Sequence, residues 1–187
     1  MRERTLVGTV SALLVVMAAA ILVAQGPDEA GVRVLVRATA RTSAVLLCLA
    51  LASWAPALAG ALAPRRAAFV RSLAVSHGLH LLAVLELARL TDGANLLERA
   101  SAGRIGGGVL AYVVILAGAL WPRHRLVEAG LLWVWVSFMA SYVPRAVHSP
   151  WTYGPIVVLL LASLGLRAAG AMATRAEAPP APGDVAA

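Results

Sequence analysis

The stretch TLVGTVSALLVVMAAAILVAQ, residues 5–25, decides the class of this protein. It contains no charged side chain, and a helix of this length, at about 1.5 Å per residue, crosses a hydrocarbon core of about 30 Å. The charged residues before it are also typical of a signal peptide, but the apolar core of a signal peptide has only roughly 7–15 residues. We therefore expect an uncleaved membrane span here, with cleavage as the alternative.

Five more apolar blocks follow along the 187 residues, and they predict spans at residues 42–64, 67–90, 105–121, 126–143 and 151–166. The chain is 60% hydrophobic and only 13% charged, whereas a soluble domain has about 25% charged residues. Such a chain cannot cover a water-facing surface with polar groups. The sequence predicts an all-α membrane protein: a six-helix transmembrane bundle over residues 1–173, followed by a disordered Pro- and Ala-rich tail over residues 174–187.

The charge distribution favours membrane lipid and disfavours nucleic acid as a partner. Sixteen basic residues against nine acidic ones give a net charge of +7, but the basic residues are spread over the ends of the apolar blocks. With the N-terminus inside, nine arginines fall on the cytoplasmic side and seven outside, and the loops after the second and fourth blocks carry arginine without acid. We expect a multi-pass protein of the inner (cytoplasmic) membrane with both termini cytoplasmic.

Polar groups are concentrated in the third block, RSLAVSHGLHLLAVLELAR, residues 71–89. His77 and His80 are three residues apart, so both project from nearly the same face of a helix. Gly78 between them would allow a neighbouring helix or a flat ligand to approach closely. Because neutral imidazole is a common ligand of metals and of haem iron, both histidines are candidate iron ligands. The alternative is that each forms a hydrogen bond across the bundle.

A basic stripe precedes the second block. Arg33, Arg37 and Arg41 follow one another at intervals of four residues, on a stretch over residues 31–44 that we expect to lie at the membrane interface. They could bind lipid headgroups. The alternative is a clamp for the acid group of a cofactor, which makes Arg37 and Arg41 candidate cofactor-binding residues.

Two carboxylates lie near the ends of blocks. Glu86 is three residues before Arg89, and we expect the two to pair near the outer surface. Glu128 lies beside Arg125 and His124, and we expect a similar surface pairing there.

Several motifs together resemble the small bacterial members of the ferric-reductase-like transmembrane group. They are RATARTSA at residues 37–44, SHGLH at 76–80, WVWVSFMASYVPR at 133–145 and LGLR at 164–167. The group includes the haem-binding membrane subunits of sulfoxide reductases and the membrane domain of NADPH oxidases. The resemblance covers residues 31 to 170 and rests on short motifs. It implies a six-helix bundle whose third and fifth helices hold b-type haem between histidines.

The chain departs from that family pattern at one position. The fifth helix of the relatives opens with a Leu-His pair three residues before a glycine, whereas Leu126 and Val127 precede Gly130 here. His124 and His148 flank this block at opposite ends, and neither is level with His80. A kink at a proline near His148 would be needed to bring it closer, so His148 is a weak metal-ligand candidate.

Two functions follow from these observations. The first is an integral membrane b-type haem protein that passes electrons across the membrane with a partner reductase or quinol, as a subunit of an oxidoreductase. Weak or five-coordinate ligation is then expected, with His77 slightly preferred for its depth. The second is a haem-free scaffold or accessory subunit with the same bundle. The sequence carries no nucleotide-binding motif, so a partner would have to supply flavin or NAD(P)H.

Overall fold

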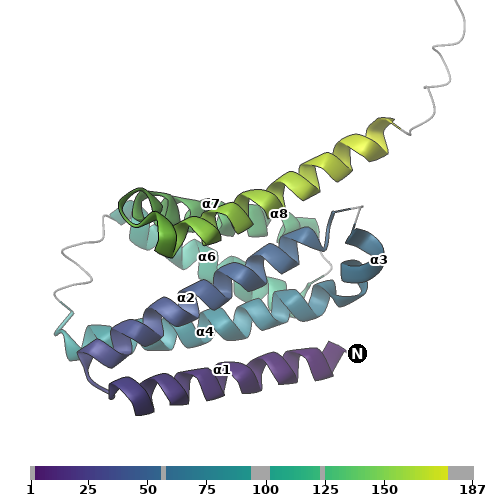
Figure 1. Cartoon of the computed structure of the whole chain (residues 1–187). Helices are drawn as coiled ribbons and strands as arrows, with labels where there is room; N and C mark the ends of the chain where they lie inside the picture. The colour runs from purple at the N-terminus through teal and green to yellow at the C-terminus, as the bar shows by residue number, and fades with distance from the viewer. Residues whose placement is uncertain (1–2, 56–57, 94–101, 123–124, 177–187) are drawn as a thin grey trace, which may run out of the picture.

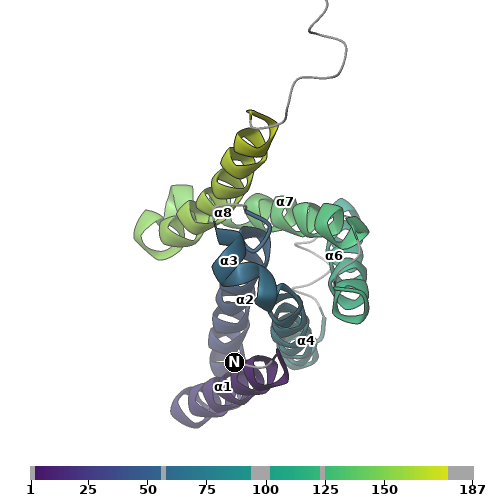
Figure 2. The same cartoon turned by 90° about the vertical axis from the view of Figure 1, so that its right-hand side faces the viewer.

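The computed structural model describes residues 3–55, 58–93, 102–122 and 125–176, and every regular element in these ranges is helical (Figures 1 and 2). A short helix and a 3-10 turn, α3 and η2, precede α4. The elements are α1 (Glu3–Gln25), α2 (Glu29–Ala52), α3 (Ala59–Leu62), η2 (Ala63–Arg65), α4 (Arg66–Leu90), α6 (Ala102–Leu120), α7 (Arg125–His148) and α8 (Pro150–Ala176).

Five helical segments are long and apolar enough to cross a membrane. They are α1, α2, the segment Gly60–Leu90 that joins α3, η2 and α4, and then α7 and α8. This composition confirms an all-α protein and indicates a multi-pass membrane protein. The apolar segment of α6, Gly106–Leu120, is shorter than the other five, so a sixth full span stays a prediction. The first turn of α1 and the last turn of α8 lie at the same end of the bundle (Figure 1).

The second helix differs from the expected span, and the boundaries 42–64 are wrong. The helix begins at Glu29 because Asp28 caps it, with Asp28 Oδ1 accepting a hydrogen bond of 3.0 Å from the Gly31 N–H. It ends at Ala52, where the Ser53 hydroxyl donates to the Ala50 carbonyl at 2.6 Å. The arginine stripe therefore belongs to the long helix itself, and no separate interfacial segment precedes that helix.

The last two helices run further than expected. Pro144 lies inside α7, which continues to His148, and Pro155 lies inside α8, which continues to Ala176. A proline inside a helix removes one backbone N–H donor but does not always end the helix. Residues 174–176 are thus helical, while the rest of the expected tail, residues 177–187, lies outside the described residues.

The tightest helix pair is α2 against α4, joined by small polar residues. Thr39, Ser43, Ser72 and Ser76 are all fully buried, and the Ser43 and Ser76 hydroxyls form a hydrogen bond of 2.9 Å. Small residues let two helix backbones approach closely, which is the main source of helix association inside a membrane. By contrast, α1 lies at the edge of the bundle, where it packs on α2 and α4 and exposes much of its apolar surface (Figure 2).

Ion pairs join helices at the end of the bundle where the described chain begins. Arg71 pairs with Glu3 of α1 and donates through Nε to the Ala119 carbonyl of α6 at 3.2 Å. Glu128 pairs with Arg167 of α8, which corrects the expected pairing beside Arg125. The helix α8 brings a distant guanidinium to this carboxylate, and sequence proximity could not indicate that.

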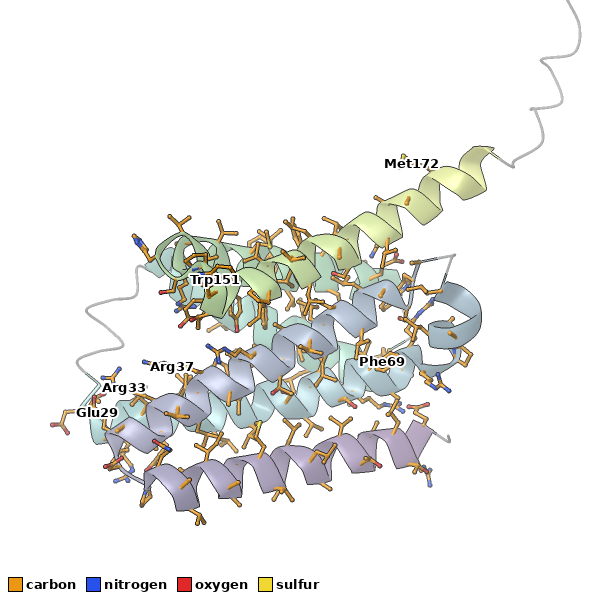
Figure 3. The ribbon with its side chains drawn as sticks, in the orientation of Figure 1. Glu29, Arg33, Arg37, Phe69, Trp151 and Met172 are labelled. Atoms are coloured by element: carbon orange, nitrogen blue, oxygen red, sulfur yellow. The ribbon has the colours of Figure 1, made fainter. Side chains whose placement is uncertain are left out.

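At the other end of the bundle, the expected Glu86–Arg89 pair is confirmed. Arg89 donates to Glu86 through Nε at 2.8 Å and through Nη2 at 2.6 Å. Figure 3 shows Glu29, Arg33 and Arg37 gathered at this same end. Residues three apart are neighbours on the surface of any α-helix, so this pair could be predicted from the sequence.

Candidate functional site

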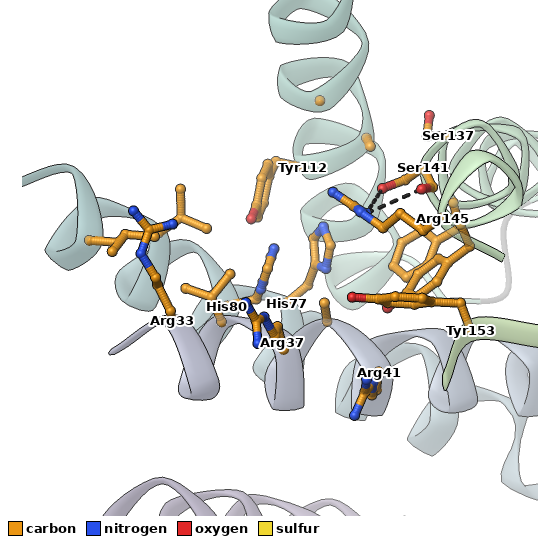
Figure 4. Close-up of a pocket in the computed structure, with 18 residues that line it drawn as sticks. Arg33, Arg37, Arg41, His77, His80, Tyr112, Ser137, Ser141, Arg145 and Tyr153 are labelled. Atoms are coloured by element: carbon orange, nitrogen blue, oxygen red, sulfur yellow. Dashed lines mark hydrogen bonds between the residues drawn. The ribbon is translucent and has the colours of Figure 1, made fainter. Parts of the chain in front are cut away.

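A cavity of about 570 Å³ lies in the half of the bundle that carries the α2 arginines, and Figure 4 shows side chains that line it. Five helices line it: α2, α4, α6, α7 and α8. The N-terminal half of α2 and the C-terminal half of α4 form one wall, and α6 and α7 contribute the wall that faces it. Its size is in the range of small-molecule sites, about 300–1,000 Å³.

The cavity is strongly cationic. Four arginines line it, and among the described lining residues there is no carboxylate. Arg33 is paired with Glu29, and Arg145 donates to the Ser141 carbonyl at 3.2 Å and hydroxyl at 2.5 Å. The remaining two are Arg37 and Arg41.

Arg37 and Arg41 are the two lining arginines for which the described chain shows neither an ion pair nor a hydrogen bond. Neither forms an ion pair in the part of the chain that the structure describes. The Nε of Arg41 is buried without a hydrogen-bond partner, and its Cζ lies 5.6 Å from the ring centroid of Tyr153. Guanidinium groups with free N–H donors suit the carboxylate or phosphate of an anionic ligand.

The two histidines lie side by side in the cavity, as their spacing predicts. Their ring centroids are 5.5 Å apart with an interplanar angle of 29°. His80 Nδ1 lies 3.1 Å from the Thr39 hydroxyl oxygen, whereas the buried Nδ1 of His77 has no hydrogen-bond partner. A Cβ on Gly78 would meet no heavy atom within 4 Å, so the expected close approach of a neighbouring helix at this glycine is wrong, while the approach of a flat ligand stays a prediction.

Aromatic rings cover His77 on the side away from α2. The ring of Tyr112 lies 4.5 Å and that of Phe138 5.7 Å from the His77 ring, measured between centroids. Tyr112 comes from α6 and Phe138 from α7. The cavity therefore combines a flat, apolar wall with a cationic edge.

This arrangement can be tested against the b-type haem that the family resemblance implies. Two imidazoles that bind one iron must lie on opposite sides of it, but His77 and His80 are stacked on one helix face. The rings that contact His77 from the facing helices are those of Tyr112 and Phe138, and the described chain holds no cluster of three or more His, Cys, Asp or Glu side chains for a metal. Ligation of one iron by both histidines does not fit this arrangement, so a haem in this cavity would be held by one of them.

The other predicted site residues are placed as follows. Arg37 and Arg41 line the same cavity as the histidines. His148 is exposed at the last residue of α7 and is not among the described lining residues. His124 lies outside the described residues.

Val127, the position that carries a histidine in the ferric-reductase-like group that the sequence resembles, is far from the cavity. It lies ten residues before Ser137, the first residue of α7 in the cavity wall, which is about 15 Å along a helix. It is buried beside Gly118, whose added Cβ would lie 3.1 Å from Val127 Cγ1. A histidine at this position would not face His77 or His80.

Sequence reasoning missed several lining residues. Ser137, Ser141 and Arg145 are spaced by four residues along α7, the same interval as the α2 arginines, so this polar stripe was detectable. Tyr112 gave no such signal, because it is a single polar group in an apolar block. Thr39, which lies behind the cavity wall, matters only through its contact with His80 on another helix.

No protein-family model, curated protein or solved structure matches this chain. The resemblance to the ferric-reductase-like group therefore rests on the short sequence motifs alone.

Proposed function

We propose that this protein is an integral membrane haem protein of ferric-reductase type, whose cavity would hold a b-type haem through one histidine. The observation that carries the proposal is the lining of a single cavity by two histidines and four arginines, with no carboxylate among its described residues. Haem b is a flat molecule with two acid groups and an iron that accepts imidazole. Each of these features has a matching group in the cavity.

The roles of the residues follow from their positions. A histidine of α4 would hold the iron, and Arg37 and Arg41 would bind the acid groups through charge-assisted hydrogen bonds. Tyr112 and Phe138 would form the apolar wall that excludes water from the ring. When bound, the haem supplies one-electron chemistry.

Electrons would come from a partner reductase or from quinol, since the chain carries no nucleotide-binding motif of its own. If both termini are cytoplasmic, the cavity lies toward the outer face of the inner membrane. It lies in the half of the bundle that is opposite the start of α1 and the end of α8. An acceptor at the outer face is then the natural partner of the haem.

The test is a spectrum of protein purified after haem-replete expression. We expect a Soret band that shifts on dithionite reduction, and carbon monoxide binding by the reduced protein, because only one histidine would hold the iron. The double variant His77→Ala/His80→Ala should lose the band. His148→Ala is the matched control, since His148 does not line the cavity and its removal should leave the band unchanged.

A haem-free scaffold or accessory subunit is the second candidate. It is favoured by one observation: the rings that contact His77 from α6 and α7 are those of Tyr112 and Phe138, and neither is a histidine. Folded protein without Soret absorbance after haem supplementation would overturn the haem proposal and support this candidate.

A further inference from the structure

We infer that Thr39 is a positioning residue for His80: its hydroxyl keeps the imidazole proton on Nδ1, so that Nε2 presents its lone pair to the cavity. The tautomer is a property of the chain alone. That the lone pair meets haem iron rests on the proposed function.

The hydrogen bonds of Thr39 carry the inference. Thr39 is fully buried on α2, and its Oγ1 donates to the Leu35 carbonyl at 2.8 Å, with the Val36 carbonyl at 3.1 Å. A hydroxyl has one proton and two lone pairs. With the proton directed at its own helix, the hydroxyl oxygen is left to accept from the third neighbour, His80 Nδ1 at 3.1 Å. This arrangement of the three contacts assigns the imidazole proton to Nδ1.

The consequence for His80 follows from the chemistry of neutral imidazole. One ring nitrogen is a donor and the other an acceptor, so protonation at Nδ1 leaves Nε2 with a free lone pair. The ring lines the cavity and rises from α4 toward Tyr112 (Figure 4). Histidines that bind metals almost always donate their other N–H to an oxygen, which fixes the ring and makes the ligating nitrogen more basic. His80 has this arrangement across the α2–α4 interface.

His77 lacks a comparable partner. Its Nδ1 is buried without a hydrogen bond, and its neighbours are the rings of Tyr112 and Phe138 together with His80 itself. Nothing among the described residues sets the position of its proton. Of the pair, His80 thus has the arrangement of a metal-binding histidine, whereas the preference for His77 rests on depth alone, and His77 would form part of the wall.

The first experiment needs no haem. Protein labelled with ¹⁵N-histidine is placed in bilayers and its imidazole nitrogens are observed by solid-state NMR, where only four histidines contribute and His80→Ala assigns the signal. We expect a protonated Nδ1 and an unprotonated Nε2 for His80. Thr39→Val should shift this tautomer toward Nε2–H, and Thr39→Ser should restore it.

The matched control is Thr42→Val, one turn along α2. The Thr42 hydroxyl donates to the Ala38 carbonyl at 3.0 Å and contacts Met17, and it forms no hydrogen bond with a histidine of the described chain. This variant should leave the His80 signals unchanged. An Nε2–H tautomer in the wild type, or a His80 tautomer that Thr39→Val does not alter, would overturn the inference.

The second experiment separates this inference from the proposed function. In haem-loaded protein, Thr39→Val should lower haem affinity by about 10–100-fold and lower the iron–histidine stretching frequency in the resonance Raman spectrum, with Thr39→Ser close to wild type. Haem binding with an unchanged stretching frequency would refute the role of Thr39 and leave the haem proposal intact. Absence of haem with the Nδ1–H tautomer present would refute the haem proposal and leave the tautomer standing.

Discussion

Replacing Gly31 with alanine should open the connection between α1 and α2 and destabilise the bundle. A Cβ at Gly31 would lie 1.9 Å from the carbonyl oxygen of Gly26 and 2.9 Å from its carbonyl carbon. Ordinary contact begins at 3.4 Å, so the backbone would have to move by about 1.5 Å. Both opposing atoms belong to the main chain, so no change of rotamer can relieve the clash.

The magnitude follows from three terms. Overpacking a tight site costs about 1–3 kcal/mol. Movement of the Gly31 N–H away from Asp28, whose Oδ1 it meets at 3.0 Å, weakens a helix cap worth about 0.5–2 kcal/mol. Alanine recovers about 0.5–1 kcal/mol of helix preference over glycine. We therefore expect a net loss of about 1–4 kcal/mol in the free energy of unfolding.

The assay is unfolding of purified protein in mixed micelles with increasing denaturing detergent, followed by the fluorescence of the five tryptophans. Gly165→Ala is the control, because Gly165 is exposed in α8 and an added Cβ would meet no heavy atom within 4 Å. This variant should be neutral or more stable by up to about 1 kcal/mol. Equal stabilities of the two variants would refute the steric argument at Gly31.

Further predictions concern the site, the ion pairs and the topology. Arg41→Gln should reduce bound haem at saturation without changing membrane insertion; unchanged haem content would remove its role as an acid-group clamp. Glu128→Gln should lower the free energy of unfolding by about 1–3 kcal/mol, since the side chain of its partner Arg167 is only 21% exposed. Glu29→Gln, at the more exposed pair with Arg33, should cost at most about 0.5 kcal/mol. Equal losses of the two variants in the same micelle assay would contradict this ranking. Reporter fusions after Trp121 should be cytoplasmic and those near Ser149 periplasmic, and the inverse pattern would reverse the orientation.

Features that depend on local periodicity could be predicted from the sequence. The apolar blocks indicated an all-α membrane protein, and the expected third span over residues 67–90 differs from α4 by one residue at its start. The shared face of His77 and His80 and the Glu86–Arg89 pair were also predictable. In each case one helix holds all the partners, so helix geometry alone places them.

The tertiary structure decided which of these groups meet. The sequence placed the α2 arginines at an interface outside the helix, but α2 begins at Glu29 and carries them along the wall of a cavity that also holds the histidines. Thr39 acquires a role only because α4 brings His80 within 3.1 Å, and Glu128 finds its partner on α8. A polar group inside a membrane must be satisfied by whichever helix packs beside it, and that neighbour is set by the packing of the whole bundle.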